Sequence, residues 1–270
     1  MVEKGLAEQK IVAIGGGELG RPNKEKGGFY PVETTLIDKK IIALSGKNSP
    51  KILFIPTASS DSAGYVEVVK KHFGERLGCK VDALLLKKQK YTKKEIEEKI
   101  FSSDIIYVGG GNTLKMIKLW KKLRVNKILE NAREKGIVLS GLSAGAICWF
   151  SLGNSDSRKF KNPKADYIKV SGLGMIKALL CPHYNVGPTY ISKNQDRRSS
   201  LKRMMRVTPG VAIALENCSA LEVVGNKARL IVSKPSACGY KIFWSKGMYH
   251  KEKLIKNKWL LVSDLVKKLK

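Results

Sequence analysis

The residues with the clearest chemical meaning lie in the segment 136–150, which reads GIVLSGLSAGAICWF. It places Ser143 between Gly141 and Gly145, the GxSxG pattern of a serine nucleophile, with an apolar run before it and a helical pattern after it. The two glycines allow a sharp turn that lifts Ser143 clear of a sheet, and a helix N-terminus favours developing negative charge. Although such a serine can also be only a helix cap, we expect Ser143 to be the nucleophile of an acyl transfer.

A nucleophilic serine needs a base, and the chain has three histidines. His72 falls within an amphipathic helical pattern, and His250 lies among lysines in a polar stretch. His183 follows the apolar run 178–181 in LLCPHYNVGP, which places it at the end of a predicted strand. We therefore predict that His183 is the base.

The residues alone leave open which acid would orient this histidine. Asp156 lies in the loop after the serine, and Glu216 comes at the end of a later predicted strand. Asp166 is a weaker third candidate. Each of these carboxylates could instead cap a helix or meet a lysine.

A second glycine-rich loop, residues 109–112, follows an apolar run and precedes a helical pattern. The sequence contains no GxxxxGK[ST] phosphate loop, and neither this loop nor the glycines at 15–20 match GxGxxG. Beside a serine nucleophile, the loop is better suited to give a backbone N–H to an oxyanion hole. The N–H of Ala144 would be its partner donor.

These loops need a scaffold that brings them to one edge. Short apolar runs alternate with amphipathic stretches over the first half of the chain, which is typical of a parallel sheet with helices on both faces. In such a sheet the chemistry lies at the carboxyl ends of the strands. The predicted strands are 11–14, 51–56, 81–86, 104–108 and 137–139, and the predicted helices are 65–77, 93–101 and 113–123.

Beyond Gly210 the pattern changes to short runs typical of strands, which read as an extension of the sheet or a set of hairpins. Residues 260–270 predict a closing amphipathic helix. Because we find no repeat, linker or low-complexity segment, we expect a single α/β domain over residues 1–270. The later strands are predicted at 211–215, 220–224, 229–233 and 240–244.

The composition excludes several classes of protein. The 270 residues are 43% hydrophobic, so the chain is globular, and no apolar run reaches the roughly 18–20 residues of a membrane span. The first ten residues lack the apolar stretch of a signal peptide, so we expect a cytoplasmic protein. Five scattered cysteines without CxxC spacing argue against a disulfide framework or a zinc site, and nothing demands a metal or another cofactor.

The charge is unusual, with 51 Lys and Arg against 23 Asp and Glu and a net charge of +28. Such an excess raises nucleic acid as a partner. However, the lysines occur in ones and twos, and no block of five or six like charges exists. We therefore favour a solvated basic surface, expect neither a nucleic-acid nor a membrane partner, and leave a homodimer open.

Taken together, these motifs resemble the peptidase E (aspartyl dipeptidase) and cyanophycinase family of serine peptidases. The resemblance extends in family order over about residues 10–244 and rests most firmly on the GGGNT, GLSAGA and PHY motifs in combination. It implies a fold like that of class I glutamine amidotransferases, which carry a cysteine where this chain has Ser143. The matching stretches are GGGELG (15–20), FIPTASSDS (54–62), DIIYVGGGNTLKM (104–116), GLSAGAICWF (141–150), CPHYN (181–185) and IALENCSAL (213–221).

The resemblance also implies roles for individual residues. Ser143 would be the nucleophile and His183 the base, and the N–H groups of Gly110, Gly111 and Ala144 would line the oxyanion hole. Peptidase E implies an aspartate, nearest to Asp156, whereas cyanophycinase implies a glutamate, matching Glu216. An arginine of peptidase E that holds the substrate's aspartyl carboxylate matches Arg197, fourteen positions after His183, and Asn112 is a second candidate for substrate binding.

The function we expect is hydrolysis of small peptides through an acyl-enzyme, with dipeptides that begin with aspartate as one candidate substrate. Two alternatives remain at this stage. An α/β-hydrolase esterase would use a late histidine, which would be His250. A family member without activity would be a basic binding protein, recognised by steep salt dependence.

Overall fold

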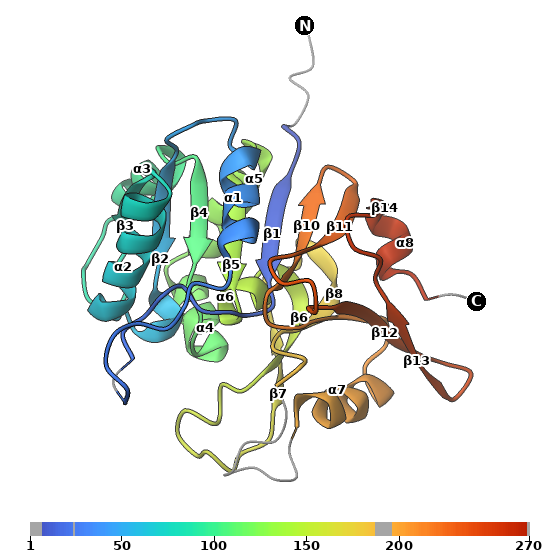
Figure 1. Cartoon of the computed structure of the whole chain (residues 1–270). Helices are drawn as coiled ribbons and strands as arrows, with labels where there is room; N and C mark the ends of the chain where they lie inside the picture. The colour runs from blue at the N-terminus through green and yellow to red at the C-terminus, as the bar shows by residue number, and fades with distance from the viewer. Residues whose placement is uncertain (1–6, 24, 187–195, 269–270) are drawn as a thin grey trace, which may run out of the picture.

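The computed structural model describes residues 7–23, 25–186 and 196–268. These residues form two β-sheets, of eight and six strands, with helices packed against them (Figure 1). The eight-stranded sheet has the order β14-β11-β10-β1-β5-β4-β2-β3. The parallel part of this sheet consists of β1 (Lys10–Ile14), β5 (Val138–Leu142), β4 (Ile105–Val108), β2 (Lys51–Ile55) and β3 (Lys80–Ala83).

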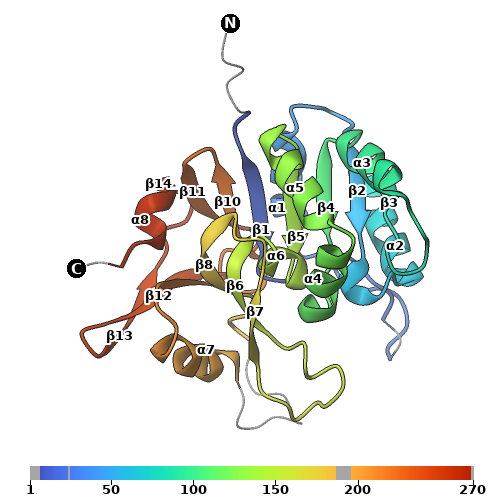
Figure 2. The same ribbon diagram turned by 180° about the vertical axis from the view of Figure 1, so that it is seen from behind.

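Helices cover both faces of this parallel part. Alternate strand residues point to opposite faces, so in β1 Ile11 and Ala13 join one core cluster and Val12 and Ile14 the other. The near-continuous apolar strands follow from burial on both faces. One face carries α1 (Thr35–Leu44), α2 (Ala63–Val69) and its π-helical continuation η2 (Lys70–Arg76); the other carries α3 (Lys93–Phe101), α4 (Thr113–Lys122) and α5 (Val125–Glu134), seen in Figure 2.

Local sequence accounts for where two of these helices begin. Thr92 and Glu95 form a capping box at the start of α3, in which each side chain accepts a backbone N–H of the other residue. Asn112 caps α4 by accepting the N–H of Lys115. The second cap ties the glycine-rich loop before α4 to the helix, which places this loop at the carboxyl end of β4.

The remaining strands of the eight-stranded sheet are antiparallel. β10 (Ser219–Val224) pairs with β1, β11 (Lys227–Val232) pairs with β10, and the two-residue β14 (Leu260–Leu261) pairs with β11. The chain then ends in α8 (Val262–Val266).

The six-stranded sheet has the order β13-β12-β9-β8-β6-β7. β6, β8 and β9 run parallel, and the other pairs are antiparallel. A short helix, α6 (Ala144–Ile147), connects β5 of the first sheet to β6 of the second. The strands are β6 (Phe150–Ser155), β7 (Ile168–Ser171), β8 (Ile176–Cys181), β9 (Val211–Leu215), β12 (Gly239–Ser245) and β13 (Met248–Lys253); α7 (Arg197–Arg206) lies before β9.

The predicted α/β class is confirmed, and the predicted strands and helices of the first half lie within a few residues of the observed ones. The helix predicted over 260–270 is wrong in extent, because residues 260–261 pair with β11 and α8 spans five residues. Residues 269–270 lie outside the described part. No helix in the described ranges is both long and apolar enough to cross a membrane.

Candidate active site

The turn after β5 holds Ser143 in a backbone conformation that only close packing can maintain. Ser143 has φ 57° and ψ −109°, a strained combination for a residue with a side chain. A Cβ on Gly141 would lie 2.4 Å from the carbonyl oxygen of Gly145, and a Cβ on Gly145 would lie 2.0 Å from that of Val108. Both glycines of the GxSxG pattern are therefore required by the close approach of backbone segments.

The end of β1 brings three loops together. Successive carbonyl oxygens of residues 14–16 accept N–H groups from Ser143 (3.0 Å), His183 (2.9 Å) and Cys218 (2.8 Å). Ser143 follows β5, His183 follows β8, and Cys218 lies between β9 and β10. The predicted nucleophile and the predicted base thus follow strands of different sheets and are anchored to adjacent residues.

The same three residues are all strained. His183 has φ 51° and Cys218 φ 65°, in addition to Ser143 at 57°. Positive φ in a residue other than glycine costs on the order of 1–3 kcal/mol and persists only where the surroundings impose it. Such strain gathers at functional sites, and two of the three residues, Ser143 and His183, are ones for which the sequence motifs predict a function.

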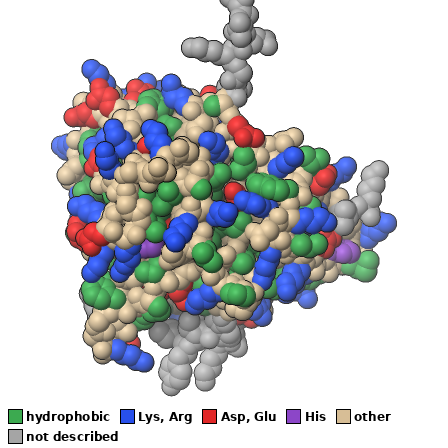
Figure 3. Space-filling view, turned by 45° about the horizontal axis from the view of Figure 1, so that its top comes forward, with side chains coloured by type: hydrophobic (Ala, Val, Ile, Leu, Met, Phe, Trp, Pro, Cys, Tyr) green, Lys and Arg blue, Asp and Glu red, His purple; other side chains and the backbone are tan. Residues whose placement is uncertain are grey.

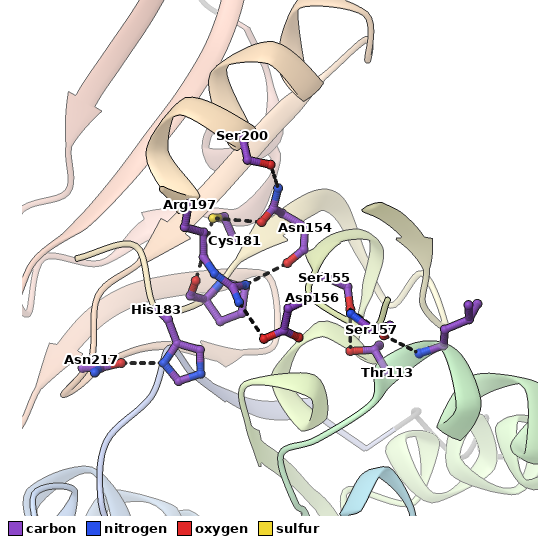
Figure 4. A network of polar contacts seen from close by, with 12 residues as sticks. Thr113, Asn154, Ser155, Asp156, Ser157, Cys181, His183, Arg197, Ser200 and Asn217 are labelled. Atoms are coloured by element: carbon purple, nitrogen blue, oxygen red, sulfur yellow. Dashed lines mark hydrogen bonds and ion pairs between the residues drawn. The ribbon is translucent and has the colours of Figure 1, made fainter. Parts of the chain in front are cut away.

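The ring of His183 is held by Asn217. Nδ1 of His183 lies 2.6 Å from Oδ1 of Asn217, and the N–H of Asn217 is in turn bonded to Oδ1 of Asn185. Gly16 packs against this pair so closely that a Cβ there would lie 2.2 Å from the Asn217 oxygen. Figure 4 shows the imidazole between Asn217 on one side and the Arg197–Asp156 pair on the other.

Burial and the nearby positive charge of Arg197 lower the pKa of His183 from its ordinary 6.5 to about 4. The imidazole is therefore neutral at pH 7 and able to accept a proton. Because Asn217 Oδ1 is an acceptor, the proton of the neutral ring sits on Nδ1, which leaves Nε2 as the basic nitrogen.

Ser143 Oγ has no hydrogen-bond partner among the residues that the structure describes. In enzymes without substrate, the bond between nucleophile and base is often long and tightens when substrate binds. The backbones of both residues are anchored to adjacent carbonyl groups at the end of β1.

The two predicted acids have other partners. Glu216 is 9% exposed; it accepts the N–H of Cys238 at 2.9 Å and the hydroxyl of Tyr240 at 3.4 Å. Asp156 accepts a hydrogen bond from Arg197 at 3.2 Å. Within the described ranges, neither carboxylate is hydrogen-bonded to His183.

Arg197 lies beside the predicted base and is 4% exposed. Its guanidinium donates to the carbonyl of Asn154 at 3.0 Å and to Asp156, and it stacks over the ring of Tyr167 at 4.6 Å. This is the position that the resemblance assigns to a substrate carboxylate. In this structure Asp156 supplies a carboxylate to the same guanidinium (Figure 4).

The predicted oxyanion loop is adjacent to the nucleophile. A Cβ on Gly110 would lie 3.5 Å from Cβ of Ser143, so the two backbones are in contact. The N–H of Gly110, however, donates to the hydroxyl of Tyr65 at 3.3 Å. Gly111 has φ 137° and lies against the Ala58 carbonyl, a position open only to glycine.

Tyr65 was not predicted from the sequence. Burial raises the pKa of its hydroxyl to about 12, so the group stays protonated at neutral pH. Since the oxygen accepts from Gly110, its own proton is still available for donation. The clue in the sequence was the position of Tyr65 at the start of a helix that follows the polar stretch TASSDS.

Asn112 is buried, and its side chain makes hydrogen bonds that hold the fold together. It is 6% exposed, caps α4 and donates from its side-chain amide to the carbonyl of Ser157 at 2.9 Å. Hydrogen bonds among Thr113, Ser155 and Ser157 complete the link (Figure 4). The predicted substrate-binding residue Asn112 therefore joins the oxyanion loop to the segment that carries Asp156.

A cavity of about 670 Å³ opens beside His183. This volume is within the range of small-molecule sites, about 300–1,000 Å³. Its wall includes Leu142, which precedes the nucleophile, and Tyr65. The other wall is formed by the segment after β1, with the exposed ion pair of Glu18 and Arg21 at 2.8 Å.

The other two histidines have structural partners. His72 is 1% exposed and bonds through Nε2 to the buried Asp38 at 2.8 Å, which ties η2 to α1. His250 lies on β13 at the edge of the six-stranded sheet and stacks on Phe243 with ring centres 4.8 Å apart. The esterase alternative, which requires His250 as base, has no support in this arrangement.

The described part of the chain contains no group of three or more His, Cys, Asp and Glu side chains that could hold a metal ion. The five cysteines are buried free thiols. Burial raises the pKa of the thiols of Cys79, Cys148, Cys181 and Cys218, so these groups stay protonated.

Comparison with known proteins identifies relatives. The family model described as Peptidase family S51 matches residues 28–231. The uncharacterized peptidase YgaJ of Bacillus subtilis (strain 168) is 35% identical over 178 residues, 66% of this chain and 69% of that protein. Peptidase E of Nostoc sp. (strain PCC 7120 / SAG 25.82 / UTEX 2576) is 27% identical over 196 residues, 70% and 75% of the two chains.

The fold is also found among solved structures. The crystal structure of a peptidase from an acI-B1 Actinobacterium superposes with a TM-score of 0.67, covering 97% of this chain and 100% of that one. At 18% identity this likeness concerns the fold alone. It agrees with the α/β architecture derived above.

Proposed function

This chain belongs to peptidase family S51, and we propose that it hydrolyses short peptides with Ser143 as nucleophile and His183 as general base. A serine peptidase is a hydrolase, so the reaction class follows from the family. The roles of the individual residues and the class of substrate are our proposal. The N–H groups of Ser143 and His183, held on neighbouring carbonyl groups of β1, are the observation that supports the residue assignment most strongly.

The reaction proceeds by acyl transfer. Nε2 of His183 removes the proton of Ser143 Oγ while that oxygen attacks the peptide carbonyl carbon. The tetrahedral intermediate collapses with cleavage of the C–N bond, and the imidazolium returns its proton to the departing amine. Water, deprotonated by the same ring, then attacks the ester, and the acid product leaves Ser143 free.

Asn217 is a positioning residue in this scheme. Its Oδ1 accepts the Nδ1–H of His183 at 2.6 Å, which selects the tautomer with a basic Nε2. An amide in this place has a precedent in the Cys-His-Asn arrangement of papain-like proteases. Since the amide carries no charge, it stabilises the imidazolium less than a carboxylate would, which agrees with the low pKa of the ring.

The oxyanion is stabilised by donors from two loops. The N–H of Ala144 lies at the start of α6, where the helix dipole adds to the effect. From the opposite loop, the N–H of Gly111 and the hydroxyl of Tyr65 are the proposed donors. Because the N–H of Gly110 is bonded to Tyr65, it acts through that hydroxyl and need not reach the substrate.

The cavity beside His183 and the nearby Arg197 support short peptides with an acidic first residue as substrates. A space of about 670 Å³ beside His183 suits a short peptide. We propose that an acidic first residue is bound by Arg197, as the name of a 23% identical relative from Drosophila melanogaster, probable alpha-aspartyl dipeptidase, suggests. Asp156 already contacts this guanidinium, so a substrate carboxylate has to share or displace that contact.

A dipeptide library tests the proposal. Members that begin with aspartate, glutamate, isoaspartate and neutral residues are incubated with the wild-type protein and with Ser143→Ala. We expect release of the first residue from at least one member, with Asp-Xaa fastest, and loss of about 10³-fold or more in the variant. Equal cleavage by both proteins would exclude Ser143 as nucleophile.

We also propose a cytoplasmic location. The five buried thiols, none of them in a disulfide, fit a reducing compartment.

A further inference from the structure

A second cavity, of about 540 Å³, lies away from the proposed active site and has an unusual lining. It is formed by α4, by the short helix η1 (Thr57–Ser59) with the residue after it, and by the loop that follows β3. It shares no lining residue with the cavity beside His183. α4 lies on the face of the sheet that Figure 2 shows. The lining residues are Thr57, Ser60, Lys87, Lys115, Lys118, Leu119 and Lys122.

Four of these seven residues are lysines. Lys115, Lys118 and Lys122 are three and four positions apart, so they share one face of α4, and all three are exposed. Among the described residues, no carboxylate forms an ion pair with any of them, and the sequence of α4 contains no acidic residue. Like charges at this spacing repel one another.

Hydrogen bonds to Asp61 and Ser60 hold Lys87, the fourth lysine, in place. The buried carboxylate of Asp61 accepts the backbone N–H groups of Lys87 at 2.6 Å and Lys88 at 3.0 Å. The side chain of Lys87 then reaches Oγ of Ser60 at 2.9 Å. Lys87 therefore has a defined position, and the carboxylate of Asp61 is hydrogen-bonded to the backbone of this loop.

Two hydroxyl groups complete the lining. Thr57 is 4% exposed, and its oxygen accepts the indole N–H of the fully buried Trp120 at 3.3 Å. Ser60 accepts from Lys87. Since each oxygen already accepts a hydrogen bond, both hydroxyl protons can be donated to a ligand. The polar side chains that line the cavity are all able to donate hydrogen bonds.

We propose that this cavity binds a small oligophosphate, an anion with two or more linked phosphate groups. Four lysine side chains that form no ion pair with a described carboxylate, together with two hydroxyl groups, match a ligand with several negative charges and many acceptor oxygens. The volume falls within the range of small-molecule sites. No aromatic side chain lines the cavity, so it lacks the stacking surface on which single-stranded nucleic acids bind.

Titration calorimetry with tripolyphosphate and inorganic phosphate on the full-length protein tests this inference. We expect one tripolyphosphate per chain, bound at least tenfold more tightly than inorganic phosphate. The triple variant K115Q/K118Q/K122Q should lose at least tenfold in affinity. Lys87→Gln, in a different segment, should weaken binding as well. Circular dichroism checks that each variant is folded.

The matched control is K39Q/K40Q/K258Q, which removes the same charge from exposed lysines elsewhere. It should bind tripolyphosphate within about twofold of the wild type. Equal losses in the two triple variants would mean that only the overall charge attracts the anion, and would overturn the site. Absence of saturable binding would also overturn it.

Discussion

Three residues at the proposed active site adopt backbone conformations that side chains normally avoid. Ser143, His183 and Cys218 all have positive φ, and all three donate their N–H groups to the end of β1. The strain is stored where the reaction needs fixed positions. Ser143 follows β5 and His183 follows β8, so both strained residues lie in the turns just beyond their strands.

Asn217 provides a test of how the base is held. Replacing it by alanine should lower kcat/KM by about 10–100-fold, because the ring loses the acceptor that fixes its tautomer. The matched change Glu216→Gln should leave kcat/KM within about threefold, since Glu216 contacts Cys238 and Tyr240 instead. If Glu216→Gln were the damaging change and Asn217→Ala the harmless one, Glu216 would be the orienting residue.

The pH profile of the same residue separates this role from a purely structural one. The base must be neutral, so wild-type activity should persist on acidification until the pH approaches the His183 pKa of about 4. Asn217→Asp places a negative charge beside the ring, which favours the imidazolium and raises its pKa. The acid limb of kcat/KM should therefore move to higher pH in Asn217→Asp and stay in place in Glu216→Gln.

At this scale the motifs predict roles for Ser143 and His183, but they do not point to Asn217 or Tyr65. Glu216 and Asn217 are neighbours, and which of them faces His183 depends on the turn at Cys218, whose φ is 65°. The residue types in the sequence do not specify the backbone angle at Cys218. The choice between carboxylate and amide therefore needed the folded loop, as did the contact of Tyr65 with Gly110.

At the scale of elements, the turn from β5 into α6 depends on close packing against β4. Gly145 lies so near the carbonyl of Val108 that a methyl group has no room, and the neighbour is backbone that cannot rotate away. Gly64 in α2 is a contrasting case, with nothing within 4 Å of its Cβ position and no positive φ.

Gly145→Ala should lower the free energy of unfolding by about 2–4 kcal/mol, because the added Cβ forces strands apart. Gly64→Ala should raise it by about 0.5–1 kcal/mol, since alanine favours a helix and loses less chain entropy. Urea unfolding followed by circular dichroism measures both. Equal stability of the two variants would show that the elbow does not approach β4 as closely as described.

The sequence predicted the first five parallel strands well, because buried strands alternating with amphipathic helices have distinct periodicities. It did not predict α1 or α5, nor the division of the strands into two sheets. In α1 the polar Asp38 is buried against His72. A polar residue on the buried face interrupts the apolar periodicity by which an amphipathic helix is recognised in a sequence. Strands of both sheets are short apolar runs, so only their pairing partners distinguish them.

At the scale of the whole molecule, the net charge of +28 is spread widely. Figure 3 shows one face, on which Lys and Arg side chains are scattered among other residues. Such a field acts at long range and attracts anions at low salt. It can raise the rate at which acidic substrates arrive without taking part in the chemistry.

This steering predicts a difference between substrates. The Debye length falls from about 30 Å at 0.01 M salt to about 8 Å at 0.15 M, which screens the field. Over this range kcat/KM for an Asp-Xaa dipeptide should fall several-fold, while that for a neutral dipeptide should change little. A parallel fall for both substrates would assign the effect to the enzyme itself.

Reaction with a fluorophosphonate probe, mapped by mass spectrometry of peptides, tests the central claim most directly. The probe forms a covalent bond with an activated serine as fluoride leaves. We predict that it modifies Ser143 in the wild type and in His250→Ala, that no site is modified in Ser143→Ala, and that modification slows strongly in His183→Ala. Modification of another residue in Ser143→Ala, or an unchanged rate in His183→Ala, would contradict the account.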